Sequence, residues 1–160
     1  MSKLLYGFSD RECLFKQVQS VCDVLGHGAN KTAIPLLLET MAVETDLGQT
    51  PDRSISAGMG IAQFDEEPFY DVMRRIRLSD YYEIEQRFGI DLKLVQWEDL
   101  RYNPFLSIIA MRLKYKLIPQ QIPTTLEGRA AYWKQHYNSS AGKGTVKHYL
   151  ESAEAIYGRP

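Results

Sequence analysis

The chain has 160 residues, of which 44% are hydrophobic and 24% charged, and its formal net charge at pH 7 is -1. This length suits one ordinary domain with a real core, and the near-neutral charge argues against nucleic-acid binding by bulk attraction to phosphates. No apolar run approaches the ~20 residues of a membrane span, and the N-terminus lacks an apolar stretch long enough for a secretion signal. We therefore expect synthesis in the cytoplasm, with no signal peptide, no membrane span and no nucleic-acid partner.

Apolar residues at helical spacing predict a first helix over about residues 10–25, with a possible capping box beginning at Ser9. Thr32 can cap a second helix over about residues 33–44, which is apolar nearly all round and is therefore expected to be central. Residues 46–66 contain glycines, serines and aspartates without a helical period, which predicts a long loop or small hairpin. Long loops in compact domains are usually functional.

The second half of the chain is also predicted to be helical. Asn103 before a proline, Thr124 and Thr145 all suit the N-cap of a helix. Helices are expected over residues 67–76, 80–88, 91–99, 104–115, 125–136 and 146–156. Strand-like alternation never exceeds a few residues, so the chain is predicted to be a single mainly α domain over residues 1–160, packed around the 33–44 helix.

Glu44 is the main candidate for chemistry because it lies where the buried helix is predicted to end. A carboxylate at the negative end of a helix, backed by apolar side chains, resists ionisation and can hold a proton near neutral pH. A general acid needs this property, although a lone glutamate near a helix end is more often a solvated surface residue. The three histidines and two cysteines share no spacing typical of a metal site, so neither a metal nor another cofactor is expected.

Several short motifs occur together in order. They are Glu44-Thr45, Ser54, Gly60-Ile61-Ala62-Gln63, Asn103-Pro104, and Tyr137-Asn138 followed by Gly142. In order and spacing, over roughly residues 33–150, they resemble the lysozyme-like soluble lytic transglycosylase family. Thr45 stands where that family has a serine, Ile61-Ala62 replaces Leu-Met, and two serines follow Asn138 where the family has alanine and glycine. The resemblance implies a lysozyme-like domain that cleaves the β-1,4 bond between N-acetylmuramic acid and N-acetylglucosamine in peptidoglycan.

The resemblance also implies a role for each matched residue. Glu44 would be the catalytic acid and base, and Ser54 and Gln63 would line the cleft and hydrogen-bond the sugar or its N-acetyl group. Tyr137 would position Glu44 or the substrate, and Asn138 would brace the same wall. Each has a plainer reading, in which Gln63 caps backbone groups of a turn and Tyr137 is a core residue with a locally bonded hydroxyl.

Three other functions stay open beside the favoured transglycosylase. A hydrolytic, phage-type lysozyme needs a second carboxylate to activate water, which Asp46, Asp52 or Asp65 could supply, with Asp52 the most plausible. A structural virion or tail protein, or a carbohydrate-binding module, would need no acid at Glu44. The expected partners are peptidoglycan glycan strands and other phage virion or tail proteins. The expected site of action is the periplasmic cell wall, reached inside a phage particle or after release by a holin.

Overall fold

The computed structural model describes residues 10–49, 58–138 and 144–158. Within these ranges the chain forms seven α-helices, and its only extended pairing is one antiparallel bridge, which confirms the mainly α prediction. None of the described helices is long and apolar enough to cross a membrane. The helices are α1 (Arg11–Leu25), α2 (Ala33–Thr45), α3 (Glu66–Arg75), α4 (Leu78–Phe88), α5 (Pro104–Lys116), α6 (Leu126–Trp133) and α7 (Val146–Tyr157). Shorter turns are η1 (Leu92–Leu94), η2 (Trp97–Leu100) and the π-helical η3 (Lys134–Asn138).

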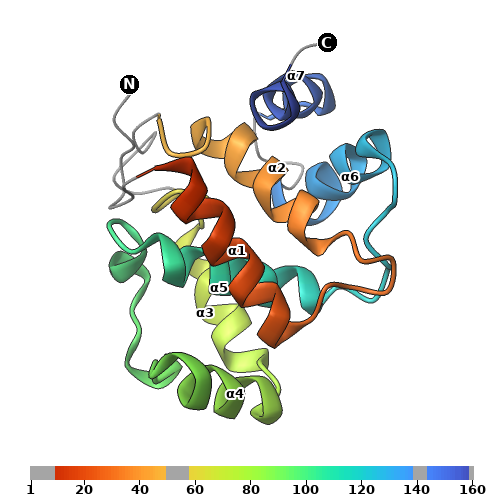
Figure 1. Cartoon of the computed structure of the whole chain (residues 1–160). Coiled ribbons are helices and arrows are strands. Elements are labelled where there is room, and N and C mark those ends of the chain that lie inside the picture. The colour runs from red at the N-terminus through yellow and green to blue at the C-terminus, as the bar shows by residue number, and fades with distance from the viewer. Residues whose placement is uncertain (1–9, 50–57, 139–143, 159–160) are drawn as a thin grey trace.

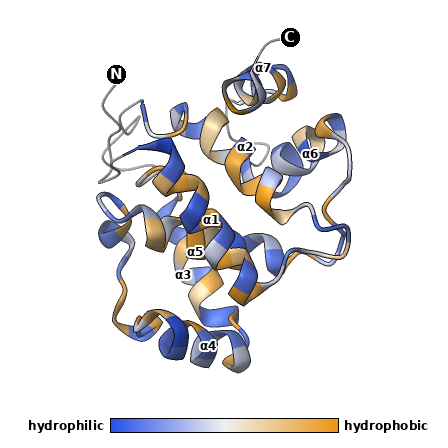
Figure 2. Cartoon of the chain, viewed as in Figure 1, coloured by the Kyte–Doolittle hydropathy of each residue, from blue (hydrophilic) through white to orange (hydrophobic). Residues whose placement is uncertain are grey.

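The second helix, α2, is the most buried element of the structure. Eleven of its 13 residues are buried, including Glu39 and Glu44. It packs against α1, α5 and α7, and α7 also lies along α6, whereas α4 lies at the opposite end of the molecule (Figure 1). In Figure 2 the α2 ribbon is coloured mainly as hydrophobic, whereas the α4 ribbon is mainly hydrophilic. A helix covered on several sides needs apolar residues around most of its circumference, which is the pattern of this segment.

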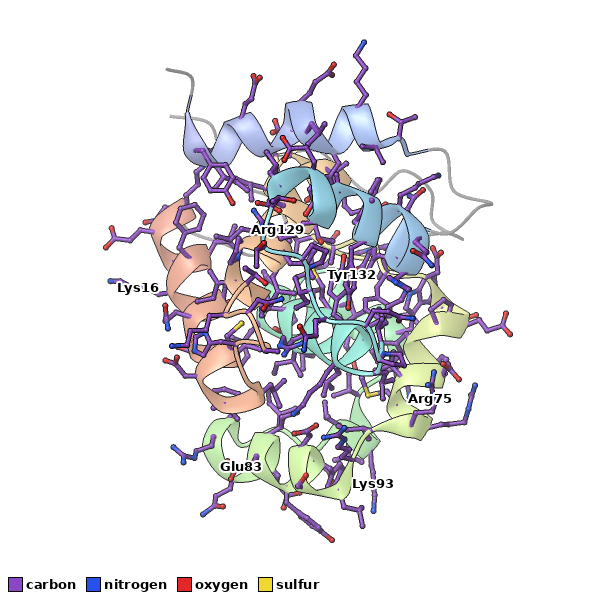
Figure 3. The ribbon with its side chains drawn as sticks, turned by 90° about the vertical axis from the view of Figure 1, so that its right-hand side faces the viewer. Lys16, Arg75, Glu83, Lys93, Arg129 and Tyr132 are labelled. Carbon is purple, nitrogen blue, oxygen red and sulfur yellow. The ribbon has the colours of Figure 1, made fainter. Side chains whose placement is uncertain are left out.

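The charged side chains labelled in Figure 3 lie in different surroundings. Lys16, Arg75 and Lys93 project from the surface, while Arg129 is buried and, like the neighbouring Tyr132, points into the molecule (Figure 3). An arginine is rarely buried without a partner, because removing its charge from water is costly. Arg129 therefore marks a place where the core contains an opposite charge.

Local sequence signals placed most helix starts correctly. Asn103 and Thr145 are N-caps as predicted, and each side chain accepts a hydrogen bond from the backbone N–H three residues later. Two caps differ by one residue. Asp10 caps α1, and Thr125 rather than Thr124 caps α6. Each is the residue whose side-chain oxygen reaches the third backbone N–H of its helix.

The predicted helix over residues 91–99 is wrong, because this segment forms the two short turns η1 and η2 instead. The Asp91 side chain accepts a hydrogen bond from a backbone N–H two residues later. The Gln96 backbone N–H donates to the Asp99 carboxylate at 2.8 Å, and the Asp99 backbone N–H donates to the Gln96 carbonyl at 3.0 Å. These local bonds compete with helical bonds and end each turn after three or four residues.

Candidate functional site

Glu44 lies in the last turn of α2, and only 7% of the residue is exposed. Its Oε2 accepts a hydrogen bond of 3.1 Å from the indole Nε1–H of Trp133. Lys114 and Tyr115 on α5 and Tyr137 on η3 lie within electrostatic reach, because the charge of Glu44 favours the protonated form of each of them. Among the described residues, Glu44 is therefore a buried carboxylate that contacts one indole and acts electrostatically on at least two tyrosines and one lysine.

The end of α2 is joined directly to the turn at residues 58–64. The Thr45 hydroxyl donates to the Ile61 carbonyl at 2.7 Å and accepts from the Gly48 backbone N–H at 3.0 Å. Asp46 follows in the left-handed conformation, with a φ of 52°, which ends the helix. Thr45 thus fixes the end of the helix that carries Glu44 against this turn.

Residues 58–64 form a tight turn closed by the backbone pair Met59 and Phe64, with N–H to carbonyl distances of 2.9 and 3.1 Å. This bridge lies in the segment predicted as a long loop or small hairpin over residues 46–66, of which residues 50–57 lie outside the described residues. Gly60 has a φ of +78°, and a Cβ built on it would lie 2.4 Å from the Leu100 carbonyl oxygen. A glycine is needed here both for its backbone conformation and for the close approach of η2.

Side chains from three other elements hold the carbonyl groups of this turn. Besides Thr45, the Tyr137 hydroxyl donates to the Ala62 carbonyl at 2.8 Å, and the Trp97 indole donates to the Phe64 carbonyl at 2.6 Å. The turn is therefore fixed from α2, η3 and η2 at once. A turn held at so many points keeps its shape.

Gln63 and Tyr137, both predicted to belong to the site, lie in or against this turn and are 8% exposed. The Gln63 side-chain amide donates to the Gly60 carbonyl at 3.0 Å, so part of its hydrogen bonding is local to the turn. The Tyr137 ring stacks on Tyr115 at 5.3 Å and meets Phe64 edge-on at 5.8 Å. Burial raises the pKa of Tyr137 well above its usual value, so Tyr137 is a neutral hydrogen-bond donor.

The other predicted site residues are placed differently. Asn138 is half-buried, and its side-chain oxygen accepts from Lys134 at 2.9 Å within η3. Ser54 and Asp52 lie outside the described residues, as does the glycine of the last motif. Of the two other candidate second carboxylates, Asp46 and Asp65 are both exposed. The charge of Asp65 acts on Tyr137 and Lys114, as the charge of Glu44 does, which puts Asp65 near the same group.

Lys114 was not expected from the sequence. Its ammonium lies 4.4 Å from the ring centre of Tyr137 and 5.3 Å from that of Phe64, and 3.5 Å from the Tyr137 carbonyl oxygen. Burial lowers the pKa of Lys114, and the nearby charges of Asp65 and Glu44 oppose this effect. Lys114 also lines a pocket of about 290 Å³ formed with α3 and η3. Its place on an apolar helix gave the only sequence signal, a charged residue inside an otherwise buried pattern.

Trp133 was also missed, because an aromatic residue within a helical pattern is usually a core residue. It stands four residues before Tyr137, a spacing that brings two side chains to one face of a helix. Among the described residues, no three His, Cys, Asp or Glu side chains come together as a metal site would require. Comparisons of the chain with protein-family models, with curated proteins and with solved structures found no match.

Proposed function

We propose that this protein is a peptidoglycan-degrading glycosidase with a lysozyme-like fold. It cleaves the β-1,4 bond between N-acetylmuramic acid and N-acetylglucosamine as a lytic transglycosylase. The observation that carries the proposal is the Glu44 carboxylate, buried at the end of α2 among aromatic side chains and bonded to an indole N–H. A carboxyl group in such surroundings suits a general acid, and glycoside cleavage needs one.

The environment of Glu44 contains opposing influences on its proton. Burial among aromatic side chains favours the neutral carboxyl group, which can protonate the leaving oxygen. The Trp133 N–H and the Lys114 charge favour the carboxylate, which can take a proton back. A residue that acts first as acid and then as base has to exist in both forms during one turnover.

Both proton transfers would use Glu44. Glu44 donates its proton to the glycosidic oxygen as the bond to the anomeric carbon breaks, and the N-acetyl group of muramic acid supports the resulting cation. The Glu44 carboxylate then removes the proton from the C6 hydroxyl, whose oxygen attacks the anomeric carbon and closes a 1,6-anhydro ring. Water is not consumed, so no second carboxylate is needed. Gln63, and Ser54 and Asn138 by the family resemblance, would contact the sugar.

Tyr137 acts on the wall of the site in this proposal. Its hydroxyl donates to the Ala62 carbonyl, so its role is to hold the shape of the turn at residues 58–64. The protein would act on glycan strands of the periplasmic cell wall, carried with other phage virion or tail proteins or released by a holin. A hydrolytic lysozyme is the second candidate, because the exposed Asp65 lies near the same groups as Glu44 and could activate water.

Digestion of purified bacterial sacculi tests the proposal. A transglycosylase releases muropeptides that are lighter by one water at the muramic end than hydrolysis products, which mass spectrometry distinguishes. We expect Glu44→Gln to lower the rate of release by about 10²–10⁴-fold, the usual contribution of a general acid. The matched control is Glu85→Gln, the same substitution at an exposed position on α4, which should leave the rate unchanged.

The other outcomes separate the alternatives. Ordinary reducing ends would identify a hydrolase and would make Asp65→Asn and Asp52→Asn the next variants to compare. Equal behaviour of the wild-type protein and Glu44→Gln, with no release by either, would overturn the enzymatic proposal and favour a structural virion protein. Retained binding to sacculi without release would favour a carbohydrate-binding module.

A further inference from the structure

Trp133, the last residue of α6, is fully buried, and its indole points at the end of α2. The 3.1 Å bond from its Nε1–H to the Glu44 Oε2 joins residues 89 positions apart in the sequence. An indole N–H donates only one hydrogen bond and carries no charge. Trp133 can therefore orient the Glu44 carboxylate without adding an ion to the site.

The indole ring of Trp133 is fixed from several sides. The ring of Tyr149 on α7 lies 5.3 Å away between centroids. A Cβ built on Gly144, just before α7, would lie 2.5 Å from the Cη2 atom of Trp133, so the backbone passes directly over the edge of the indole. The ring cannot turn without moving this backbone or α7, and it therefore holds one orientation.

The helix that carries Trp133 is itself anchored to α2. Arg129, four residues earlier on α6, forms two hydrogen bonds with the buried carboxylate of Glu39, at 2.7 and 2.9 Å. Residues four apart lie on one face of a helix, so Arg129 and Trp133 both face α2. Helix α6 thus contacts both buried glutamates of α2: Arg129 forms an ion pair with Glu39, and Trp133 donates an uncharged hydrogen bond to Glu44.

The same element also reaches the turn at residues 58–64. After Trp133 the helix widens into the π-helical turn η3, which carries Tyr137 and its bond to the Ala62 carbonyl. Single π-helical turns are often found at functional sites, because they redirect side chains within a helix. From α6 to η3, one continuous element therefore contacts both Glu44 and the turn at residues 58–64.

We propose that Trp133 is a positioning residue, which fixes one oxygen of the Glu44 carboxylate so that its proton is delivered in a constant direction. This inference rests on the proposed function. Trp133 acts through Glu44 and need not touch the substrate. Among the described residues, the charged and titratable groups of other elements that the charge of Glu44 acts on include Lys114, Tyr115 and Tyr137. The exposed Asp65 acts on Lys114 and Tyr137 as well. Replacing only the indole leaves these side chains in the protein.

The contact can be tested in the intact protein without measuring activity. The chain has two tryptophans, so a ¹H–¹⁵N spectrum should contain two indole signals, which Trp97→Phe assigns. Trp97 is the internal control, because its indole donates to the Phe64 backbone carbonyl, which does not titrate. We expect the Trp133 signal to shift with pH in one step, the Trp97 signal to shift far less, and the step to vanish in Glu44→Gln. The proposed contact would be wrong if the chemical shift of the Trp133 indole did not change with pH, or if it still changed with pH in Glu44→Gln.

Activity tests the consequence of the contact. Trp133→Phe keeps an aromatic ring but removes the donor, and a hydrogen bond to a charged group is worth about a 10- to 150-fold change. We expect kcat on sacculi to fall within that range with KM little changed. The alkaline limb of the pH profile should move to higher pH, because a donor that favours the carboxylate is gone. Tyr102→Phe, which removes a hydroxyl donor from an aromatic ring at an exposed position, should leave that limb where it is.

The possible failures can be told apart. A Trp133→Phe protein with wild-type kcat and an unmoved alkaline limb would show that Trp133 only fills space, and would overturn the positioning role while leaving the proposed function intact. If the wild-type protein releases no muropeptides although the indole signal follows Glu44, the proposed function fails, and the positioning role fails with it. Should Trp133→Phe not fold, the indole titration in the wild-type protein and in Glu44→Gln still decides whether the contact exists.

Discussion

Gly60 is the residue on which the shape of the turn at residues 58–64 depends. Its φ of +78° is strained for any residue with a Cβ, and the Leu100 carbonyl oxygen would lie 2.4 Å from that atom. The neighbouring atom belongs to the backbone of η2, so it cannot move aside as a flexible side chain can. The position therefore combines a conformational requirement with a steric one.

We expect Gly60→Ala to lower the free energy of unfolding by about 2–5 kcal/mol, combining about 1–2 for the left-handed backbone and 1–3 for overpacking. The matched control is Gly89→Ala. Gly89 has a φ of +68° but no atom within 4 Å of its ideal Cβ, so only the first cost applies. Urea denaturation of both variants measures the difference. Equal losses would mean that η2 does not press on the turn.

At the residue scale, the sequence predicts the position of Glu44 at the end of a buried helix, but it does not predict that the Trp133 indole donates a hydrogen bond to it. The end of a buried helix is visible from apolar spacing, and the structure places Glu44 there. Trp133 and Tyr137 meet their partners across 89 and 75 positions of sequence, and no periodic pattern relates residues so far apart. The bond from the Gln63 amide to the Gly60 carbonyl fits the plainer interpretation, in which Gln63 caps backbone groups of the turn.

At the element scale, a buried carboxylate joins three helices. Glu39 on α2 is fully buried, and it accepts hydrogen bonds from Arg129 on α6 and from Tyr149 and Tyr157 on α7. The hydrogen bond and charge of Glu39 raise the pKa of Arg129. All the charge in this group is thus paired inside the protein, and its geometry sets how α6 and α7 lie on α2.

Arg129→Met should therefore be costly. It leaves the Glu39 carboxylate buried without its counter-charge, and breaking a buried ion pair in this way typically lowers the free energy of unfolding by about 3–5 kcal/mol. Adding Glu39→Gln to Arg129→Met should restore part of the loss, because the unpaired charge disappears. The control is Arg75→Met, which removes an exposed ion pair with Asp71 and should cost less than about 1 kcal/mol. Thermal and urea unfolding of the wild-type protein and these three variants measure the losses of unfolding free energy. Similar losses in Arg129→Met and Arg75→Met would contradict the prediction, because burial of the ion pair would then make no difference.

Helix positions were more predictable than helix packing. Caps such as Asn103 and Thr145 depend on a few adjacent residues, so the local sequence contains the necessary information. The prediction of a helix over residues 91–99 was wrong because polar side chains of this segment bond to nearby backbone N–H groups. Apolar spacing does not reveal such bonds. The docking of α7 depends on bonds spanning 110 and 118 positions, which only the folded chain brings together.

At the scale of the whole molecule, buried tyrosines connect the elements around α2. Tyr115 on α5 stacks on Tyr132 of α6 at 5.8 Å and on Tyr137 of η3 at 5.3 Å, and its hydroxyl bonds to Thr40 of α2 at 2.8 Å. Burial raises the pKa of these three rings and of Tyr149 above the usual value of 10. The core therefore contains several hydroxyl groups that must stay protonated.

This arrangement predicts a stability that falls at alkaline pH. In the unfolded chain each tyrosine loses its proton near pH 10, whereas the folded protein holds the protons of its buried rings to higher pH. Below about pH 10 both the folded and the unfolded state keep these protons, so the buried tyrosines do not make the free energy of unfolding depend on pH. Above it the unfolded state binds fewer protons, so the free energy of unfolding decreases as the pH rises.

Urea unfolding at a series of pH values between about 7 and 12, followed by helical circular dichroism, measures this slope. Tyrosinate absorbance supplies a second signal, because it follows the ionisation of the tyrosine rings directly. The buried rings should ionise only together with loss of the helical signal. Ionisation of all ten tyrosines in an intact helical protein would contradict the prediction, since rings sealed between α2, α5 and η3 cannot release protons to water while those elements stay packed.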